Sequence, residues 1–255
     1  MANYCWDKTV SVIGDRISEI IEPSCGDGAF YHHAKHIPHF GYDIEPECSF
    51  ENIIQGDFLQ QNITYLPGRL AIGNPPFGER NSLAVKFYKK CVEVCDYIAF
   101  ILPISQFNND QQMYEFDLVY SEDLGVRNYS GIPLHCCFNI YVRPDNEEIH
   151  KKPKSYRLHD VTVMEYRRNG TYPKPQEYDF GICAWGNGSC GKQIEYVGQY
   201  AQEIYVIINN PIYKEQVLTL CQSTDWRNLY PSVSSAKLQM WKIYKHIKEN
   251  IAGIS

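Results

Sequence analysis

The feature that most constrains the fold is a nearly continuous apolar run from Asp96 to Leu102, which ends at Pro103. A strand with apolar side chains on both faces has to be covered on both faces, which is typical of a central strand in a parallel sheet. Shorter apolar runs end at Ile21 and at Gly73. The sequence therefore predicts an α/β domain in which helices cover both faces of a largely parallel sheet.

The remaining elements alternate in the way that such a domain requires. Besides the central run, strands are expected near residues 17–21, 39–43, 52–55, 70–73, 126–129 and 137–142. Helices are expected over residues 7–14, directly after the turn at 22–30, over 82–95 with Ser82 as the cap, and around 111–120. These elements predict a mostly parallel seven-stranded sheet with helices on both faces.

The tetrapeptide Asn74-Pro75-Pro76-Phe77 stands where the strand ending at Gly73 runs into a loop. Open α/β sheets hold their ligands at the carboxyl ends of their strands. The two prolines fix φ and remove two backbone donors, so the local carbonyl groups lack partners. Asn74 adds a side-chain acceptor and Phe77 an aromatic face, which together suit an exocyclic amino group on a flat base. For the tetrapeptide taken alone, a chance loop turn is the alternative.

A glycine-containing turn follows the first strand and begins a predicted nucleoside site. Its residues are Glu22, Pro23, Ser24, Cys25, Gly26, Asp27 and Gly28, followed by Ala29 and Phe30. Gly26 and Gly28 would let a ligand approach the backbone closely. The three-glycine fingerprint of dinucleotide-binding domains is absent, which argues against a dinucleotide.

Acidic residues at the ends of the second and third strands extend this predicted site. Asp43 is placed to bind ribose hydroxyl groups, and Ile44 to lie on an adenine face. Asp57 is placed to accept a hydrogen bond from an adenine amino group, and Phe58 to stack on the ring. The strand ends thus predict a nucleoside-bearing cofactor beside the tetrapeptide.

The charge is divided unevenly along the chain, whose net charge is −6. Residues 1–150 contain 10 Lys and Arg against 21 Asp and Glu, whereas residues 151–255 contain 14 against 9. The basic second half predicts a polyanionic partner, and a solvated surface with chance asymmetry is the alternative. The composition also changes here, so we expect a catalytic domain over residues 1–148 and a smaller, β-rich recognition region over 149–255.

Cations and aromatic residues are interleaved in the second half, which suits phosphate contacts and base stacking. The cations expected to contact nucleic acid are Lys151, Lys152, Lys154, Arg157, Arg167, Arg168 and Lys192. Residues 186–192 have the spacing of a phosphate-binding P-loop, but Gln193 stands where a Ser or Thr must bind magnesium, so a glycine-rich DNA-contacting loop is favoured. An amphipathic helix is expected over 234–250, with Leu238, Trp241, Ile243 and Ile247 inward and Lys237, Lys242, Lys245 and Lys248 on other faces.

The sequence contains no run of 18 apolar residues and no basic start followed by an apolar segment, so neither a membrane span nor a secretory signal is expected. Its ten cysteines have no repeating spacing and are expected to be buried thiols in a reducing cytosol. Four histidines, at 32, 33, 36 and 39, cluster without further ligands, so no metal site is expected. We therefore expect a cytoplasmic protein with no membrane partner.

In this order and spacing, the motifs resemble those of S-adenosylmethionine-dependent N6-adenine DNA methyltransferases of the γ motif order. Residues 22–30 resemble the first cofactor motif, Asp43 the ribose-binding acid, Asp57-Phe58 the adenine-contacting pair and residues 74–77 the catalytic motif. The resemblance covers residues 1–145 and implies a Rossmann-like class I methyltransferase fold. As departures, residues 4–7 stand where the family carries a Thr-Pro pair, and the aromatic residue that closes on the target base is assigned to Phe138 by position alone.

The resemblance implies methyl transfer from S-adenosylmethionine to N6 of an adenine flipped out of duplex DNA. The Asn74 side-chain oxygen and the Pro75 carbonyl would accept both N6–H bonds, and Phe77 would hold the base while the nitrogen attacks in line. RNA adenine methylation, cytosine N4 methylation, protein glutamine methylation and a non-catalytic nucleic-acid-binding paralogue stay open as alternatives. Whether a restriction endonuclease functions beside the enzyme also stays open.

Overall fold

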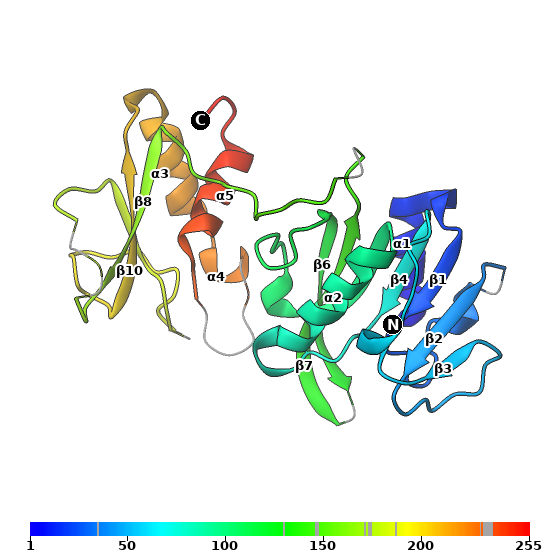
Figure 1. Cartoon of the computed structure of the whole chain (residues 1–255). Helices are drawn as coiled ribbons and strands as arrows, with labels where there is room; N and C mark the ends of the chain where they lie inside the picture. The colour runs from blue at the N-terminus through cyan, green and yellow to red at the C-terminus, as the bar shows by residue number, and fades with distance from the viewer. Residues whose placement is uncertain are drawn as a thin grey trace. The chain divides into compact units, whose positions relative to one another are not determined.

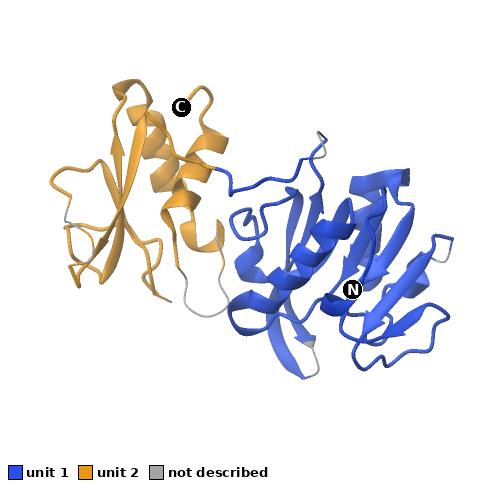
Figure 2. Cartoon of the chain, in the orientation of Figure 1, with its two compact units in different colours: residues 1–154 blue, residues 155–255 orange. Residues whose placement is uncertain are grey.

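The computed structural model describes residues 1–34, 36–129, 131–145, 148–170, 172, 175–186, 188–229, 231 and 237–255. The chain divides into two compact units, Met1–Lys154 and Ser155–Ser255 (Figure 2). The sequence puts this division between residues 148 and 149. No helix within the described ranges has both the length and the apolar character needed to span a membrane.

Unit 1 is built on a seven-stranded sheet. Its strands are β1 (Glu19–Glu22), β2 (His39–Asp43), β3 (Ile53–Gln55), β4 (Arg69–Gly73), β5 (Tyr97–Pro103), β6 (Asp117–Tyr129) and β7 (Ile132–Val142), in the spatial order β3-β2-β1-β4-β5-β7-β6 (Figure 1). All pairs from β3 to β5 are parallel, and β7 is antiparallel to both β5 and β6. The predicted mostly parallel, seven-stranded, Rossmann-like sheet is therefore confirmed.

The central strand β5 explains why both faces of the sheet are covered. Tyr97, Ala99 and Ile101 face a hydrophobic cluster that includes Cys5, Trp6 and Ile13 of α1 (Ala2–Ile13). Ile98, Phe100 and Leu102 face the opposite cluster, which includes Ala84, Tyr88, Cys91 and Val92 of α2 (Ser82–Val94). One helix therefore packs on each face, as the apolar run of β5 predicts.

Two predicted helices are not found among the described residues of unit 1. The turn after β1 leads into a short 3-10 helix, Tyr31–His33, where the Phe50 ring stacks on Tyr31 with centroids 3.9 Å apart. Residues 117–120, which were expected in a helix, belong to β6, because that strand pairs with β7 over its whole length. In both segments tertiary packing outweighs local helical pattern.

β6 and β7 extend beyond the carboxyl end of β5 as a two-stranded ribbon. The last residue of β5, Pro103, pairs with Cys136. The β6–β7 pairing continues past that point from Val126–His135 to Tyr129–Ile132 (Figure 1). This β6–β7 ribbon therefore projects from the sheet edge at which β4 delivers the tetrapeptide.

Unit 2 combines a small antiparallel sheet with helices. Its strands are β8 (Val161–Arg167), β9 (Phe180–Cys183) and β10 (Gln202–Ile208) in the order β8-β10-β9, and its helices are α3 (Lys214–Ser223), α4 (Trp226–Leu229) and α5 (Met240–Asn250). Of the helix expected over 234–250, residues 234–236 lie outside the described part, and α5 begins at Met240. The predicted inward positions Leu238, Ile243 and Ile247 are buried in the core of the unit.

Two lysines of α5 were predicted on its outer faces, and this prediction is wrong. Lys242 and Lys245 are each only 8% exposed. Their ammonium groups lie near aromatic rings, with Lys245 Nζ 5.4 Å from the centroid of Tyr156 and Lys242 Nζ 5.7 Å from that of Trp241. Long aliphatic stems let lysine pack along apolar surface, which a binary polar or apolar pattern does not capture.

Candidate functional site

The tetrapeptide Asn74–Phe77 is fixed between β4 and the first turn of α2. The Phe77 carbonyl accepts hydrogen bonds from the amides of Leu83 (3.1 Å) and Ala84 (3.3 Å). Its ring is half-buried and packs against the hydrophobic clusters on both faces of the sheet. Pro75 is buried and Pro76 is exposed. The backbone of the tetrapeptide is therefore held by the helix that follows it.

Asn74 carries a buried acceptor that nothing in the described structure satisfies. Its side chain as a whole is half-buried, but Oδ1 is covered and has no hydrogen-bond partner among the described residues. A buried oxygen in this condition is unfavourable by about 1–3 kcal/mol. Buried polar groups without partners are uncommon in native proteins, so this oxygen at the carboxyl end of a central strand requires an explanation.

The turn after β1 lies beside the tetrapeptide and is tied to the end of β2. Asp43 Oδ2 accepts a hydrogen bond from the Gly26 amide (2.8 Å), and Oδ1 accepts one from the Glu45 amide (3.0 Å). A side chain at Gly73, where the tetrapeptide begins, would contact Pro23 at 4.0 Å. The structure therefore brings residues 23–26, the end of β2 and the start of the tetrapeptide together.

Three predicted cofactor contacts remain open to a ligand. Gly26 has φ +49, and no atom lies within 4 Å of the position that a Cβ would take. Ile44 is 67% exposed. Asp57 is exposed and uses Oδ1 to accept from the Leu59 amide at 2.9 Å, and the described residues provide no partner for its Oδ2. These side chains and this backbone are accessible in the way that a nucleoside site requires.

The predicted roles of Phe58 and Gly28 are wrong. Phe58 is 2% exposed and packs against the rings of Tyr42 and Phe87, with centroids at 5.4 and 5.7 Å, so it cannot stack on an adenine. At Gly28 a Cβ would lie 2.0 Å from the ring of Phe50. The missing side chain therefore makes room for an aromatic residue of the protein rather than for a ligand.

Other residues of the first motif pack inside the protein next to the turn. Glu22 is 2% exposed, and its Oε1 lies 2.8 Å from Nε2 of His39. Burial raises the pKa of Glu22, and the nearby His39 opposes that shift. Burial also raises the pKa of the Cys25 thiol to about 12, so this cysteine is a packing residue. Ser24 is half-buried, and Asp27 is exposed and accepts from the Ala29 amide at 3.2 Å.

Phe138 was predicted to close on the target base, and the structure rules this out. The residue is 0% exposed. It lies on β7 opposite Ile101 of β5 and belongs to the cluster beneath α1. A fully buried core ring cannot stack on an extruded base. Its position near a late strand was therefore not enough to identify the aromatic residue that contacts the target base.

The predicted phosphate-binding cations differ in how free they are. Lys151, Lys152, Lys154, Arg157, Arg168 and Lys192 are exposed. Arg167 Nε donates to Glu165 at 2.6 Å, which raises the pKa of the arginine. Arg168 donates to the carbonyls of Gly198 and Gln199 at 2.7 and 3.2 Å. These two arginines are therefore already used to hold unit 2 together.

The glycine-rich stretch 186–192 does not have the context of a P-loop. Asn187 lies outside the described residues. The Cys183 amide donates to the Lys192 carbonyl at 2.8 Å, and the Gly191 amide donates to Cys183 at the same distance. The chain thus turns back to pair with β9, whereas a P-loop leads into a helix.

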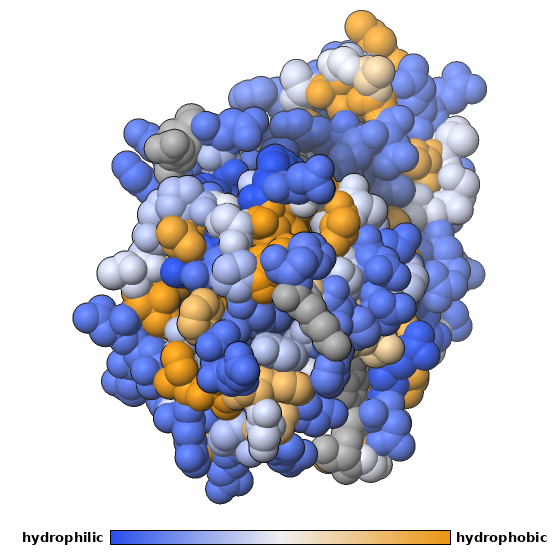
Figure 3. Space-filling model, turned by 90° about the vertical axis from the view of Figure 1, so that its right-hand side faces the viewer, coloured by the Kyte–Doolittle hydropathy of each residue, from blue (hydrophilic) through white to orange (hydrophobic). Residues whose placement is uncertain are grey.

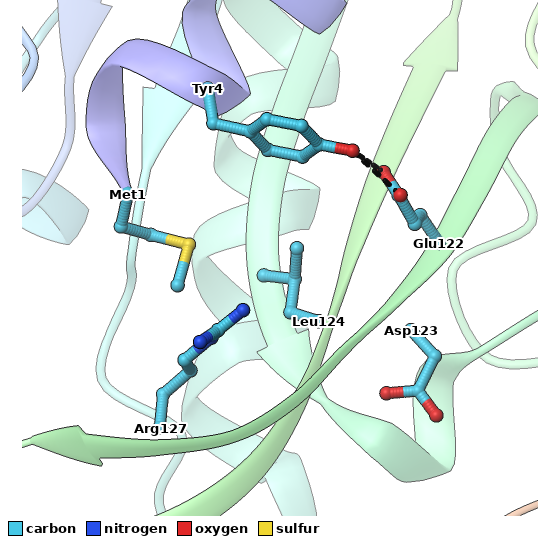
Figure 4. A pocket seen from close by; sticks show the side chains of 6 residues that line it. All are labelled: Met1, Tyr4, Glu122, Asp123, Leu124 and Arg127. Atoms are coloured by element: carbon cyan, nitrogen blue, oxygen red, sulfur yellow. Dashed lines mark hydrogen bonds between the residues drawn. The ribbon is translucent and has the colours of Figure 1, made fainter.

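A pocket of about 270 Å³ lies between the start of α1 and the base of the β6–β7 ribbon. It is lined by Met1, Tyr4, Glu122, Asp123, Leu124 and Arg127 (Figure 4). Tyr4 Oη donates to the Glu122 carboxylate at 2.6 Å, and Tyr120 donates to it at 2.6 Å. Burial alone would raise the pKa of Glu122, but these two hydrogen bonds outweigh it and lower the pKa. Arg127 points toward this hollow and has no acidic partner in the described part of the chain.

Two further amides at this edge were missed by sequence reasoning. Asn81, at the start of α2, and Gln106, at the end of the 3-10 helix Ile104–Gln106 that follows β5, are 6% and 2% exposed. Both atoms of the Asn81 amide and Oε1 of Gln106 are buried without partners among the described residues. An asparagine a few positions after the tetrapeptide was the available signal, but its burial could not be read from the sequence.

Apolar side chains on the β3 side of unit 1 are scattered. Figure 3 turns this side toward the viewer and shows small hydrophobic patches among hydrophilic residues. Ile44 and Ile54, which are 67% and 37% exposed, are large apolar residues of the β2–β3 region. Ile44, which follows Asp43, is the more exposed of the two, and apolar residues scattered in this way do not form a large apolar interface.

No family model and no curated protein matches the chain in sequence. Among solved structures it is similar to a Thermoplasma acidophilum protein, with 16% identity over 55% of this chain and 84% of the other, and a TM-score of 0.43. A proposed RNA methyltransferase from Pyrococcus horikoshii gives 13% identity over 55% and 83%, with a TM-score of 0.42. The modification subunit of a proposed type I restriction enzyme from Vibrio vulnificus gives 11% identity over 70% and 48%, with a TM-score of 0.42. Likenesses at these levels assign neither an activity nor a ligand to the chain.

Proposed function

We propose that the protein transfers a methyl group from S-adenosylmethionine to the exocyclic N6 of adenine in DNA. The observation that carries this proposal is the buried, unpartnered Oδ1 of Asn74 at the carboxyl end of β4. An exocyclic amino group has two N–H donors, and binding it would satisfy this acceptor. The sequence of the tetrapeptide and its place on the sheet both support a pair of acceptors for an amino group, Asn74 Oδ1 and the Pro75 carbonyl, which we call the cradle.

The open part of the nucleoside site fits the cofactor. Asp43 would bind the ribose hydroxyls, since each of its oxygens accepts one hydrogen bond from the described residues and has capacity for another. Ile44 would lie against the adenine ring, and Asp57 Oδ2 would accept from the adenine amino group. Gly26 would let the cofactor approach the backbone. When bound, the cofactor supplies an electrophilic methyl group on a sulfonium.

The residues of the tetrapeptide would orient the nitrogen that attacks. Asn74 Oδ1 and the Pro75 carbonyl accept the two N6–H bonds, which favours a tetrahedral nitrogen with its lone pair directed out of the ring plane. The Phe77 carbonyl is bound to two amides of α2, so the backbone at the end of the tetrapeptide is held before substrate binds, which supports preorganised acceptors. The proposed rate enhancement comes from positioning and preorganised dipoles, and no side chain has to remove a proton before transfer.

A polynucleotide substrate is supported by the charge distribution. The first 150 residues are acidic, whereas residues 151–255 contain 14 Lys and Arg against 9 Asp and Glu. Lys151 and Lys152 at the end of unit 1, and Lys192 of unit 2, are exposed and available for phosphate contacts. Arg127 at the base of the β6–β7 ribbon is a further exposed cation, and it belongs to the same unit as the tetrapeptide. The target atom is inaccessible in a stacked duplex, so the base would be flipped out and held by Phe77.

RNA adenine methylation is the second candidate, because the same cradle would accept the same amino group. The test is incubation of wild-type protein and Asn74→Ala with methyl-labelled S-adenosylmethionine and, separately, duplex DNA, single-stranded DNA and RNA. The proposal predicts label in DNA with the wild type and little or none with the variant. Label in RNA alone would favour the second candidate, and equal labelling by Asn74→Ala would reject the cradle.

A further inference from the structure

Asn81 combines deep burial with a complete lack of polar partners. The residue is 6% exposed, and both Oδ1 and Nδ2 of its amide are buried without a hydrogen-bond partner among the described residues. An amide in the interior normally finds partners for both ends. Asn81 therefore needs an explanation other than ordinary core packing.

The usual structural role of an asparagine at this position is already taken. Asn81 is the N-cap residue of α2, where its side chain would accept from the amides of Leu83 or Ala84. Both amides donate instead to the Phe77 carbonyl, at 3.1 and 3.3 Å, and Asn81 makes no side-chain cap. The tetrapeptide thus caps the helix through its backbone and leaves the Asn81 amide uncommitted.

The backbone that leads to Asn81 is held in an unfavourable conformation. Gly78, Arg80 and Asn81 have φ values of +68°, +50° and +66°. Two consecutive residues with side chains in the left-handed region are rare, and such segments are concentrated at ligand sites. This segment joins the tetrapeptide directly to α2, so its conformation fixes where the Asn81 amide lies relative to Asn74.

We propose that the Asn81 amide contacts the ring edge of the target base, beside the amino group that Asn74 accepts. This inference rests on the proposed function. Asn74 and the Pro75 carbonyl already accept the two N6–H bonds in the proposed function, so Asn81 would contribute the donor of its amide, the group with which asparagine binds a ring nitrogen of adenine. Nδ2 would donate to a ring nitrogen next to the amino group, N1 or N7. Oδ1 of Asn74, at the other end of the same short segment, is likewise buried without a partner among the described residues.

The test uses a duplex in which the methylated adenine has been mapped. That adenine is replaced by 1-deazaadenine in one duplex and by 7-deazaadenine in another, and kcat/KM is measured for wild type, Asn81→Gly and Asn108→Gly. Glycine tolerates positive φ, so Asn81→Gly removes the amide without backbone strain. Asn108 also has a positive φ, +50°, and Asn108→Gly is the matched control.

We expect wild type to lose roughly 10- to 100-fold in kcat/KM on one of the two deaza duplexes, the value of one base-reading contact. Asn81→Gly should lose the same factor on adenine, should no longer distinguish that duplex, and should keep the melting temperature of the wild type or exceed it. Wild-type discrimination retained by Asn81→Gly, or a wild type indifferent to both analogues, would overturn the inference. A lower melting temperature for Asn81→Gly than for Asn108→Gly would assign Asn81 a structural role instead. Absence of methylation by the wild type on every nucleic acid would reject the proposed function itself.

Discussion

Asn74 and Asn139 allow a direct contrast between an amide kept for a substrate and one kept for the fold. Asn139 is fully buried, and each end of its amide has partners. Nδ2 donates to the Gln106 carbonyl (2.8 Å) and to Tyr141 Oη (2.9 Å), and Oδ1 accepts from Ser121 Oγ (2.7 Å). Asn74 Oδ1 has no partner within the described ranges. The same substitution to alanine should therefore lower the stability of the fold much more at Asn139 than at Asn74.

For Asn139→Ala we expect a loss of about 2–5 kcal/mol in the free energy of unfolding, because a buried amide is removed and its partners are left unsatisfied. For Asn74→Ala we expect a change of less than about 1 kcal/mol, or a gain, because removing an unsatisfied oxygen relieves about 1–3 kcal/mol and offsets the lost packing. Methyl transfer by Asn74→Ala should fall by about 10²–10³-fold, the usual effect of removing one preorganised polar contact.

The assay is urea unfolding of wild type and both variants, together with a methyl-transfer rate at saturating cofactor. Thermal stabilisation by S-adenosylmethionine should be retained in Asn74→Ala, since Asp43 and Asp57 are untouched. Equal destabilisation by the two substitutions would refute the reasoning, because it would show that the Asn74 amide supports the fold as the Asn139 amide does.

Three further predictions concern stability. Gly28→Ala should destabilise the protein by about 2 kcal/mol or more in thermal unfolding, because φ is +73° at this residue and the new Cβ would lie 2.0 Å from the Phe50 ring. Adding Phe50→Ala to the same chain should recover part of the lost stability. Lys242→Met should raise the free energy of unfolding by up to about 3 kcal/mol at pH 7, because burial lowers the pKa of Lys242 from 10.5 to about 8. The stability of the wild type should rise between pH 8 and 10.5, so the difference in stability between variant and wild type should disappear over that range. A difference that does not change with pH would contradict this. Glu203→Gln should cost about 1–3 kcal/mol in urea unfolding, because the fully buried carboxylate accepts from the amides of Gly198 and Tyr200 and from Tyr205 Oη; an unchanged midpoint would contradict this.

The sheet could be predicted because its signals are local in the sequence. The apolar run of β5 requires cover on both faces, and the structure places alternate residues in two opposite clusters. The ends of β2 and β4 were correct to within a residue, since Asp43 and Gly73 close those strands. Turn residues and acidic residues at strand ends are short-range features, so their positions can be predicted without knowledge of the tertiary structure.

The sequence could not show which side chains are accessible at the site, because accessibility depends on the residues that pack against each side chain. Phe58 and Phe138 are aromatic residues at plausible positions, yet their rings are buried among other core side chains. Gly28 has the expected conformational freedom, but Phe50, which is distant in sequence, fills its space. Ser82 was predicted as the cap of α2, but the N-cap residue is Asn81, which makes no side-chain cap because the Phe77 carbonyl already accepts from the amides of Leu83 and Ala84.

The helical pattern also failed where a strand pairs with a distant partner. Residues 111–120 have a helical character, but β6 takes residues from Asp117 onward because β7 offers an antiparallel partner over its whole length. In unit 2, cations were counted by charge alone, whereas Arg167 and Arg168 are bound to Glu165 and to loop carbonyls. Long-range pairing of either kind is invisible to a composition argument.

The most direct test of the central claim is the identity of the methylated nucleoside. Wild-type protein is incubated with duplex DNA and S-adenosylmethionine, and the DNA is digested to nucleosides. The nucleosides are separated by chromatography and identified by mass spectrometry. A cradle made of Asn74 Oδ1 and the Pro75 carbonyl predicts N6-methyl-2′-deoxyadenosine, formed about 10²–10³-fold more slowly by Asn74→Ala. Methylation at a ring carbon or ring nitrogen, or on a protein side chain in place of DNA, would contradict the account.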